Sequence, residues 1–442
     1  MQGRKYTKDM KKILLWVLLC MVLTSFVKPL PSTSTAPAQP LKLVVLSDVH
    51  LMAPQLLEQD DSAFQAYLDG DRKLLKESSE ILDSISARVL AEHPQVLFIC
   101  GDLTKDGELV SHRMLHDRYL KQFIKRGIRV FVVPGNHDVN NPHAVIYEGE
   151  KPRRTQTVTP QQFAAIYKDC GYGNALARDP QSLSYVAQLQ PGLRLLALDA
   201  CRYEDNNYDR NTCVTGGRLK PATIAFIRKQ VEAAHRAGCK VIAMMHHGVV
   251  PHFSMEPKIL SEYLVDDYDH IGKMLDSLGV HVVFTGHLHS HDVSKSGNLY
   301  DVETGSTVSY PHPYRIITVR NNIMDIHTKH LPQVASLEKK GIKMTDKSKM
   351  FATLAVEKMT NSYLPASTPA PAKKAIGEML GQAYAIDLYG DEKPTQAFLQ
   401  QKQRIVDAIS LIDPDKAKLV DAIATSLTTD TPPADNDVQI NY

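Results

Sequence analysis

Six short apolar runs, separated by polar and helical patterns, dominate residues 41–330. Each run holds five or six consecutive residues rich in Val, Leu and Ile, a pattern typical of strands buried on both faces of a sheet. The runs are 41–46, 96–100, 129–133, 193–198, 240–245 and 280–284. We therefore expect a sheet covered by helices on both sides, followed by β-rich hairpins at 299–327.

Amphipathic helical patterns lie between these runs. Apolar residues three or four positions apart predict a helix that starts near Leu74 and ends before Pro94. A second helix around Leu115 is expected to end at Gly127, and a third to begin at Pro221 as a first-turn proline. Strands that alternate with helices in this way predict an α/β fold.

The pattern changes after residue 335. Residues 335–428 are mostly helical in pattern, and we expect an appended lobe beside a domain that spans 41–330. The polar segment 429–442 is predicted to be a disordered tail. Three roles stay open for the helical lobe: a lid, a homodimer interface or a wall-binding module.

An apolar run at 13–27 follows a basic segment at the N-terminus. It is short for a membrane span and is typical of a secretory signal. We assign 1–30 to a signal peptide or an uncleaved anchor, and 31–40 to a linker rich in Pro, Ser and Thr. We expect export to the periplasm, the cell surface or the extracellular space. A membrane tether stays open, because no clear cleavage site follows the run.

The composition and charge limit the classes of partner that we expect. With 442 residues, 43% of them hydrophobic and 23% charged, the chain is typical of a soluble globular protein rather than a collagen-like or disordered one. The formal charge of +2 hides a basic N-terminal segment, and the chain beyond Lys28 carries about −3. Because a protein that binds nucleic acid polymers is usually more basic, we expect no such partner.

Five cysteines lie beyond the signal segment: Cys100, Cys170, Cys201, Cys213 and Cys239. An odd number in an exported protein leaves at least one free thiol. Cys201 and Cys213 flank one polar loop and are the candidate disulfide. The chain has no Cys-x-x-Cys pair, so we expect no zinc–thiolate site.

Five of the six apolar runs end in Asp, His or Asn. The residues at these ends are Asp48, His50, Asp102, Asn136, His137, Asp138, His246, His247, His287 and His289. In an open α/β sheet, the carboxyl ends of the strands form the ligand crevice. We therefore expect five segments that are distant in sequence to bring these side chains to one place.

The chemistry of this set points to metal. Carboxylates, imidazoles and an amide oxygen, without thiolates, suit divalent transition ions such as Mn, Fe, Zn or Co. The set is too large for one ion and matches two that share Asp102. One ion would take Asp48, His50, Asp102 and His289, and the other Asp102, Asn136, His246 and His287. Without metal, such a buried cluster would leave polar groups unpaired at about 1–3 kcal/mol each.

The motifs Asp-x-His, Gly-Asp, Gly-Asn-His-Asp, His and Gly-His-x-His, in this order, resemble the calcineurin-like metallophosphoesterase superfamily over about residues 41–330. The resemblance implies a four-layer α/β/β/α sandwich of two mixed sheets, with a dimetal centre at the strand ends. Within the superfamily, the chain looks most like the bacterial class III cyclic nucleotide phosphodiesterases and related exported phosphodiesterases. The long helix after the first motif, the sequence Gly-Asp-Leu-Thr-Lys-Asp-Gly-Glu and the helical lobe carry that narrower resemblance.

Some positions depart from sister branches. Lys105 stands where purple acid phosphatases have an iron-binding Tyr, and Asp106 stands where Ser/Thr protein phosphatases have a phosphate-binding Arg. Asp138 stands where exported 5′-nucleotidases usually have Glu. The fourth motif reads His246-His247-Gly rather than His-His-Pro, which leaves open which His is the ligand. The resemblance favours His246.

We expect hydrolysis of a phosphodiester in a small substrate, of cyclic nucleotide or glycerophosphodiester type, by a hydroxide that bridges the two ions. His137 is not needed as a ligand, and we expect it to protonate the leaving alkoxide or stabilise phosphoryl charge. Asp138 is expected to fix the tautomer of His137. A phosphomonoesterase or nucleotidase with the same site is one alternative, and a non-catalytic protein with structural metal is another.

The sequence does not identify the groups that hold the substrate. It has no run of arginines that would predict a phosphate clamp. Several histidines and tyrosines flank the motifs and are candidates for the pocket lining. A solvated loop position is at least as open for the histidines, and a loop or packing role is favoured for the tyrosines. They are His247, His252, His291, His312, Tyr263, Tyr268, Tyr310 and Tyr314.

Overall fold

The computed structural model of the chain describes residues 40–58 and 62–442. The predicted signal segment and the linker up to residue 39 lie outside the described residues. Within them, no helix has both the length and the apolar character that a membrane span needs.

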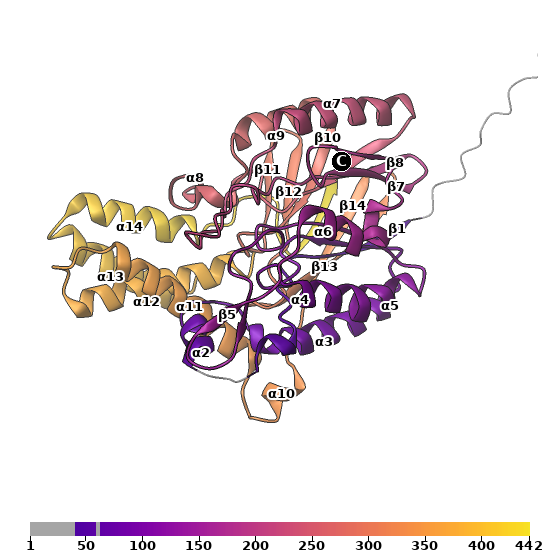
Figure 1. Ribbon diagram of the computed structural model, residues 1–442. Coiled ribbons are helices and arrows are strands. Elements are labelled where there is room, and N and C mark those ends of the chain that lie inside the picture. The colour runs from indigo at the N-terminus through magenta and orange to yellow at the C-terminus, as the bar shows by residue number, and fades with distance from the viewer. Residues whose placement is uncertain (1–39, 59–61) are drawn as a thin grey trace, which may run out of the picture. The chain divides into compact units, whose positions relative to one another are not determined.

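Two mixed sheets form the centre of the structure (Figure 1). The first has the order β15 (Asp437–Asn441), β14 (Ile323–His330), β13 (Pro313–Arg320), β1 (Leu41–Leu46), β2 (Val96–Cys100) and β3 (Arg129–Val133). The second has the order β11 (Val293–Ser296), β12 (Leu299–Glu303), β10 (Val280–Thr285), β9 (Lys240–Met244), β8 (Leu193–Ala197), β7 (Tyr185–Gln190) and β6 (Ala177–Arg178). A separate pair joins β4 (Val145–Tyr147) and β5 (Pro152–Arg154).

The strands that carry the motifs run parallel within each sheet. In the first sheet, β1 pairs in parallel with β2, and β2 with β3, while β13 is antiparallel to β1. In the second, β8, β9, β10 and β12 are parallel, and β7 and β11 are antiparallel to their neighbours. The carboxyl ends of the parallel strands of each sheet therefore lie along one edge.

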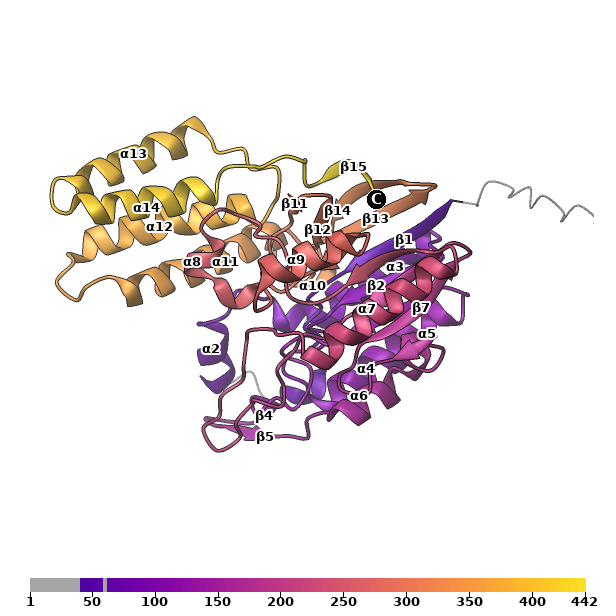
Figure 2. The same ribbon diagram turned by 90° about the horizontal axis from the view of Figure 1, so that it is seen from above.

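Helices cover the outer faces of both sheets (Figures 1 and 2). On one side lie α3 (Ser78–Ala91), α4 (Leu109–Met114) and α5 (Lys121–Ile124), the last two joined by a π-helical turn at Leu115–Leu120. On the other side lie α7 (Pro221–Arg236) and α9 (Tyr268–Ser277). Between the sheets, the rings of Phe98 and Phe284 have centroids 5.8 Å apart. The structure thus confirms the α/β/β/α sandwich.

The apolar pattern of the sequence predicted the positions of the strands correctly. Each of the six apolar runs forms a strand, and every residue of β2 is buried. Helix α7 begins at Pro221 as predicted, whereas α3 begins at Ser78 because a 3₁₀ turn precedes it. Three short helices complete this part of the chain: α2 (Ser62–Leu68), α6 (Pro160–Ile166) and α8 (Glu256–Ile259).

The helical lobe comprises α11 (Met344–Tyr363), α12 (Ala370–Asp387), α13 (Gln396–Ser410) and α14 (Pro414–Ser426), after a short α10 (Ala335–Glu338). Figure 2 shows α11–α14 grouped at one end of the sandwich. Phe253 and Leu288 of the sandwich are buried in the core of the lobe, and Met344 at the start of α11 is buried in the core of the sandwich. The lobe and the sandwich therefore share their cores.

The structure differs from the predicted disordered tail at 429–442. Residues 437–441 form β15, which pairs antiparallel with β14 and sets Ile440 opposite Met324. Val438 and Ile440 alternate with polar residues, and Ile440 is buried. This alternation is typical of a half-buried edge strand, and it outweighs the polar composition of the segment. The prediction of a disordered tail was wrong for this part.

Candidate metal centre

Five loops at the carboxyl ends of strands supply the residues of the centre. They follow β1 (Asp48, His50), β2 (Asp102), β3 (Asn136, His137), β9 (His246) and β10 (His287, His289). The structure brings these loops together, as the positions of the motifs predict.

The backbone is left-handed at many of these positions. Five residues that are not glycine have φ between 40° and 81°: Asp48, His50, Asp102, His287 and His289. Such a conformation costs roughly 1–3 kcal/mol per residue and persists where the surrounding structure enforces it. This strain therefore indicates that the required directions of the five side chains fix the backbone conformation of their loops.

Two glycines allow these loops to approach one another. A Cβ atom at Gly135 would overlap the carboxylate of Asp102, and one at Gly286 would overlap Ser47 and Asp48. Both sites need the absence of a side chain rather than a special φ. Glycine is required here because the backbone lies directly against the polar groups of a neighbouring loop.

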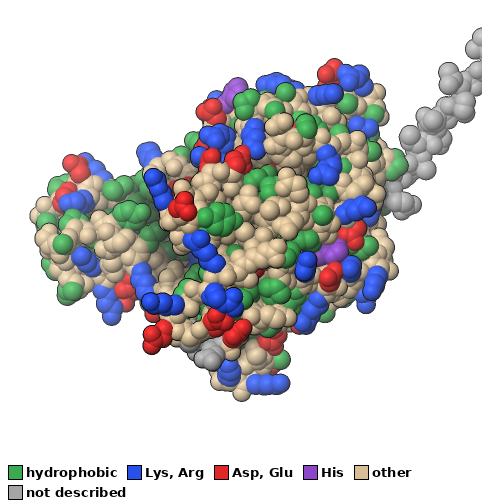
Figure 3. Space-filling model, in the orientation of Figure 1, with side chains coloured by type: hydrophobic (Ala, Val, Ile, Leu, Met, Phe, Trp, Pro, Cys, Tyr) green, Lys and Arg blue, Asp and Glu red, His purple; other side chains and the backbone are tan. Residues whose placement is uncertain are grey.

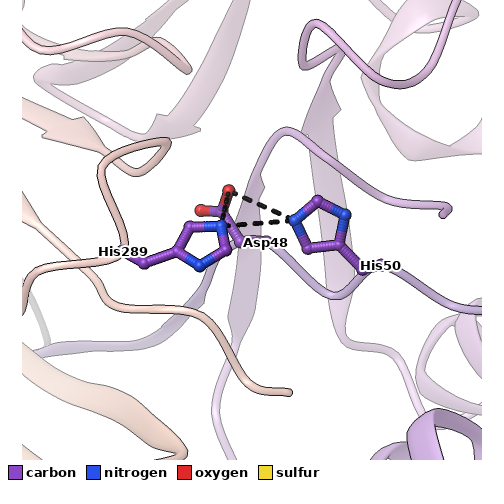
Figure 4. A group of neighbouring side chains, drawn as sticks. All are labelled: Asp48, His50 and His289. Carbon is purple, nitrogen blue, oxygen red and sulfur yellow. Dashed lines mark hydrogen bonds and ion pairs between the residues drawn. The ribbon is translucent and has the colours of Figure 1, made fainter. Parts of the chain in front are cut away.

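Asp48, His50 and His289 form the first ligand group (Figure 4). His289 Nε2 lies 3.3 Å from Asp48 Oδ1 and 3.3 Å from His50 Nε2. His50 Nε2 lies 3.8 Å from Asp48 Oδ1. Figure 4 shows the two rings and the carboxylate pointing toward a common centre.

Asp102, His246 and His287 form the second group, with ligand atoms within 4.8 Å of one another. His246 Nε2 lies 3.1 Å from Asn136 Oδ1 and 3.4 Å from Asp102 Oδ1, while its Nδ1 bonds a main-chain carbonyl. The other oxygen, Asp102 Oδ2, lies 3.5 Å from His50 Nε2. Asp102 therefore faces both groups, one oxygen toward each.

The residues present fit two divalent cations. Asp48 Oδ1 is buried and has no hydrogen-bond partner among the described residues, although a buried carboxylate oxygen normally has one. Burial alone would lower the pKa of His246, but the charges of Asp102 and Asp48 raise it to about 9. The centre thus favours positive charge, and its nitrogen and oxygen donors suit Mn, Fe, Zn or Co.

His137 lies beside the ligand groups, and its side chain is 24% exposed where Asp102 is buried. Its Nδ1 is 2.8 Å from Asp106 Oδ1 and 2.7 Å from the carbonyl oxygen of Lys105. Lys105 also forms a buried ion pair with Asp106. Burial would raise the pKa of Asp106, but Lys105 and His137 hold it well below its usual range. An ionised Asp106 therefore fixes the His137 ring.

The expected role of Asp138 is wrong. Its carboxylate accepts hydrogen bonds from the amides of Leu103, Thr104 and Gly135 at 2.8–3.0 Å, rather than from His137. Main-chain amides of two loops draw this side chain away from its neighbour in sequence. Asp138 thus joins the loops after β2 and β3. Asp106 takes the position beside His137 that was expected for Asp138.

A cavity of 330 Å³ opens over the metal centre. Its lining includes five residues of the metal centre together with Thr215 and Tyr263: Asp102, Asn136, His137, His287 and His289. Its remaining lining residues come from the segment before α3 and from α11: Gly70, Asp71, Arg72, Lys73, Ala355, Val356 and Met359. The lobe therefore supplies one wall of the cavity.

Sequence reasoning missed Arg72 and Lys73. The Arg72 guanidinium is packed between two rings, with its carbon 6.0 Å from the centroid of Tyr263 and 5.6 Å from that of Tyr384. Lys73 is buried, with its Nζ 3.4 Å from Asp71 Oδ2. The Arg-Lys pair just before the predicted helix was the available signal, but only the fold brings it to the strand ends.

Of the two neighbouring histidines in the fourth motif, His246 is the one that faces the centre. His247 Nε2 lies 3.0 Å from the carbonyl oxygen of Thr215. Tyr263 lines the cavity, and the following candidates lie away from its lining: His252, His291, His312, Tyr268, Tyr310 and Tyr314. Cys201 and Cys213 are free thiols, so the candidate disulfide is not formed.

Comparison with known proteins identifies a family. Residues 41–291 match a family model described as calcineurin-like phosphoesterase. A curated relative from Drosophila melanogaster, a metallophosphoesterase 1 homolog, is 30% identical over 104 residues. That match covers 23% of this chain and 25% of the relative, so the chain spans about a quarter of the relative's length.

Solved structures match the chain at low identity. A dimetal phosphatase from Danio rerio is 15% identical with a TM-score of 0.46, covering 66% of this chain and 96% of that one. A putative 5′-nucleotidase from Staphylococcus aureus is 12% identical with a TM-score of 0.38, covering 71% and 59%. Similarities this distant do not indicate a substrate.

Proposed function

Because the chain belongs to the calcineurin-like phosphoesterase family, we propose that it is a metal-dependent phosphoester hydrolase that cleaves a small phosphodiester. The observation that carries the proposal is the position of Asp102. Its Oδ1 lies 3.4 Å from His246 Nε2 and its Oδ2 lies 3.5 Å from His50 Nε2. One carboxylate that faces two ligand groups could be shared by a pair of divalent ions.

The chain's own residues have separate tasks. Asp48, His50, Asp102 and His289 would hold one ion, and Asp102, Asn136, His246 and His287 the other. Such a pair supplies a lowered pKa for bound water and charge neutralisation at phosphorus. His137 would donate a proton from Nε2 to the leaving oxygen, because its Nδ1 is engaged with Asp106.

The cavity walls suggest how the substrate is held. Arg72 and Lys73 place two positive charges on the wall formed by the segment before α3, where they would meet the phosphate. Ala355, Val356 and Met359 of α11 offer an apolar surface for an ester substituent. If the leaving group lies at His137, the substituent that stays on phosphorus would use this surface. A monoester has no such substituent, and this supports the diester over the monoester.

The distribution of charge supports a small substrate. Figure 3 shows acidic and basic side chains interspersed over one face of the molecule. A polymeric polyanion is usually bound by a continuous basic surface. A small phosphodiester that enters the cavity needs only the local charges of its walls.

Turnover of bis-p-nitrophenyl phosphate and p-nitrophenyl phosphate by the metal-reconstituted protein tests the proposal. We expect the diester to react faster. The Asp102→Asn variant is the matched control, because its loss of both activities excludes a contaminating phosphatase. Markedly faster turnover of the monoester would favour the phosphomonoesterase or nucleotidase alternative.

Export is part of the proposal. The basic segment followed by the apolar run at 13–27 supports secretion, with residues 1–30 as the signal or anchor. Fractionation of the producing cells tests it, since activity confined to the cytoplasm would contradict export. N-terminal sequencing of the exported protein would distinguish a cleaved signal from a retained anchor.

A further inference from the structure

A second buried cluster of ionisable side chains is hydrogen-bonded to the loop after β9, which carries His246. It consists of His252, Glu256, Asp292, Asp301 and Glu303, each no more than 5% exposed. Asp301 and Glu303 are on β12, Glu256 begins α8, and Asp292 precedes β11. We call these five residues the His252 cluster. None of them lines the cavity over the metal centre.

Two carboxylates of the cluster have clear main-chain partners. Asp301 Oδ2 accepts hydrogen bonds from the amides of Val249 and Val250 at 2.6 and 3.0 Å. Glu256 Oε2 accepts one from the amide of His252 at 2.6 Å. These bonds fix the shape of the loop after β9, three and four residues beyond His246.

Other polar atoms of the cluster have no hydrogen-bond partner among the described residues. They are Glu303 Oε1, Glu303 Oε2, Glu256 Oε1 and His252 Nε2. Glu303 is completely buried, and leaving both of its carboxylate oxygens unpaired is costly. Buried atoms of this kind normally have a partner.

Two of the unpartnered atoms, His252 Nε2 and Glu303 Oε2, lie 3.1 Å apart, the separation of ligands that share an ion. His252 Nε2 also lies 3.7 Å from Asp301 Oδ2, the oxygen that accepts the two main-chain hydrogen bonds. An ion about 2.0–2.2 Å from each nitrogen or oxygen donor sets tetrahedral donors roughly 3.4 Å apart. The observed distances lie on both sides of that value.

His252 is also oriented as a metal ligand is. Its Nδ1 lies 2.6 Å from Asp292 Oδ1, so Nδ1–H donates to that carboxylate and Nε2 points at Glu303 and Asp301. A ligating imidazole commonly donates its other N–H to a carboxylate in this way. Asp292 would therefore fix the tautomer that binds the ion.

The net negative charge of the cluster favours binding of a cation. Four carboxylates surround one imidazole, and the neighbouring Arg315 donates to the main-chain carbonyls of Glu303 and Asp292 rather than to their carboxylates. A bound cation would offset this buried negative charge, which is costly when it is left unpaired.

We propose that the His252 cluster binds a third divalent cation, of the zinc or manganese class, with His252 Nε2 and Glu303 as ligands and Asp301 beside them. An imidazole with carboxylate oxygens suits these ions. The ion would be structural, because the cluster is buried and apart from the cavity. It would stiffen the loop that presents His246 through the bonds of Asp301 to that loop.

Anomalous diffraction from crystals of the wild-type protein tests the proposal directly. We expect a peak between His252 Nε2 and Glu303, in addition to any peaks at Asp102. Metal analysis of Glu303→Gln should then show one ion per chain fewer than in the wild type. Asp179→Asn is the matched control, because Asp179 is a buried carboxylate fully engaged with Gln181, Ser182 and Thr223, and its metal content should match the wild type.

Two results would overturn the proposal. One is wild-type crystals without a peak at the His252 cluster, and the other is equal metal content in wild type and Glu303→Gln. In either case, His252 is an imidazolium that bridges Asp292 and Glu303. If Glu303→Gln does not fold, the wild-type diffraction experiment decides alone. Neither readout depends on hydrolytic activity, so the result is independent of the function proposed above.

Discussion

At the scale of single residues, Asp102 is where the two ligand groups meet. Its backbone is left-handed, with φ of 47°, and its Oδ1 accepts a hydrogen bond from the amide of His137 at 3.0 Å. Gly135 lies directly against the same carboxylate. Asp102 is therefore held by its own backbone, by an amide of the next loop and by a glycine that leaves room for it.

Gly135→Ala should disable the centre without a change of ligand. The new Cβ would overlap the Asp102 carboxylate, and a shift of about 1 Å at a catalytic group costs about 100-fold in rate. We expect at least that loss in kcat/KM, together with lost metal on elemental analysis. Gly216→Ala is the control, because its Cβ meets nothing closer than 3.9 Å. Wild-type metal content in Gly135→Ala would contradict this account.

The loss of activity caused by substitutions at His137 and at Asp106 should depend on the leaving group of the substrate. General acid catalysis contributes about 10²–10⁴-fold, but p-nitrophenolate leaves without a proton. We expect His137→Ala to lose at least 100-fold on an alkyl diester and far less on the nitrophenyl one. Asp106→Asn should show the same dependence with about a tenth of the fold-loss in activity, because Asp106 orients His137. If Asp138→Asn shows this pattern and Asp106→Asn does not, the assignment is wrong.

At the scale of elements, α11 joins the lobe to the cavity. Ala355, Val356 and Met359 line the cavity, while Leu354 on the same helix is 43% exposed and lies outside the lining. The residues that line the cavity recur at the spacing of one helix face. The helix can therefore influence which substituents bind without providing any group to the metal centre.

Val356→Ala should weaken binding of the diester and leave chemistry unchanged. Removing apolar contact of this size costs about 1 kcal/mol, or roughly a five-fold rise in KM, if the second substituent packs on α11. We expect kcat to stay at the wild-type value. Leu354→Ala is the matched control on the same helix and should leave KM unchanged. Equal KM values for all three proteins would show that the substituent binds elsewhere.

Ile440→Ala tests the edge strand β15. Ile440 is 1% exposed and packs in the core between the sheets and helices, so its truncation should destabilise the fold by about 2–4 kcal/mol. Activity should persist below the melting temperature, because β15 lies far along the sheet order from β2 and β3. Gln439→Ala, exposed on the same strand, should shift the melting temperature little. A melting temperature of Ile440→Ala equal to the wild-type value would mean that β15 is not docked.

At the scale of the whole molecule, the metal centre connects both sheets. Its ligands come from loops after β1, β2 and β3 of one sheet and after β9 and β10 of the other. Bound ions would therefore join two layers that otherwise meet through apolar packing. Metal binding should stabilise the sandwich as well as enable hydrolysis.

Removal of metal tests this connection. A ligand at 100 times its Kd stabilises a fold by about 2.7 kcal/mol. We expect chelator-treated protein to lose hydrolysis and to melt several degrees lower, with both restored by Mn or Zn. Hydrolysis that persists after elemental analysis shows the metal to be gone would contradict the proposed function. An unchanged melting temperature would show that apolar packing alone holds the sheets together.

The sequence predicted the strands and the meeting of the loops, because both follow from local patterns and from the parallel order of strands. It failed where a contact depends on how loops turn in space. Asp106, and not Asp138, reaches His137, and Arg72 reaches the cavity from a segment with no motif. The β15 strand was missed because two apolar residues in five form a weak signal without β14 beside them.

The path of the chain around the lobe has a consequence for variation of this enzyme. The chain enters the lobe after β14 and returns to pair with β14 through β15, so the helices are an insert between two neighbouring strands. Both attachment points are fixed by the sheet. An insert of another length or sequence could be exchanged there, remodelling one side of the binding pocket while the loops after β1, β2 and β3 keep their geometry.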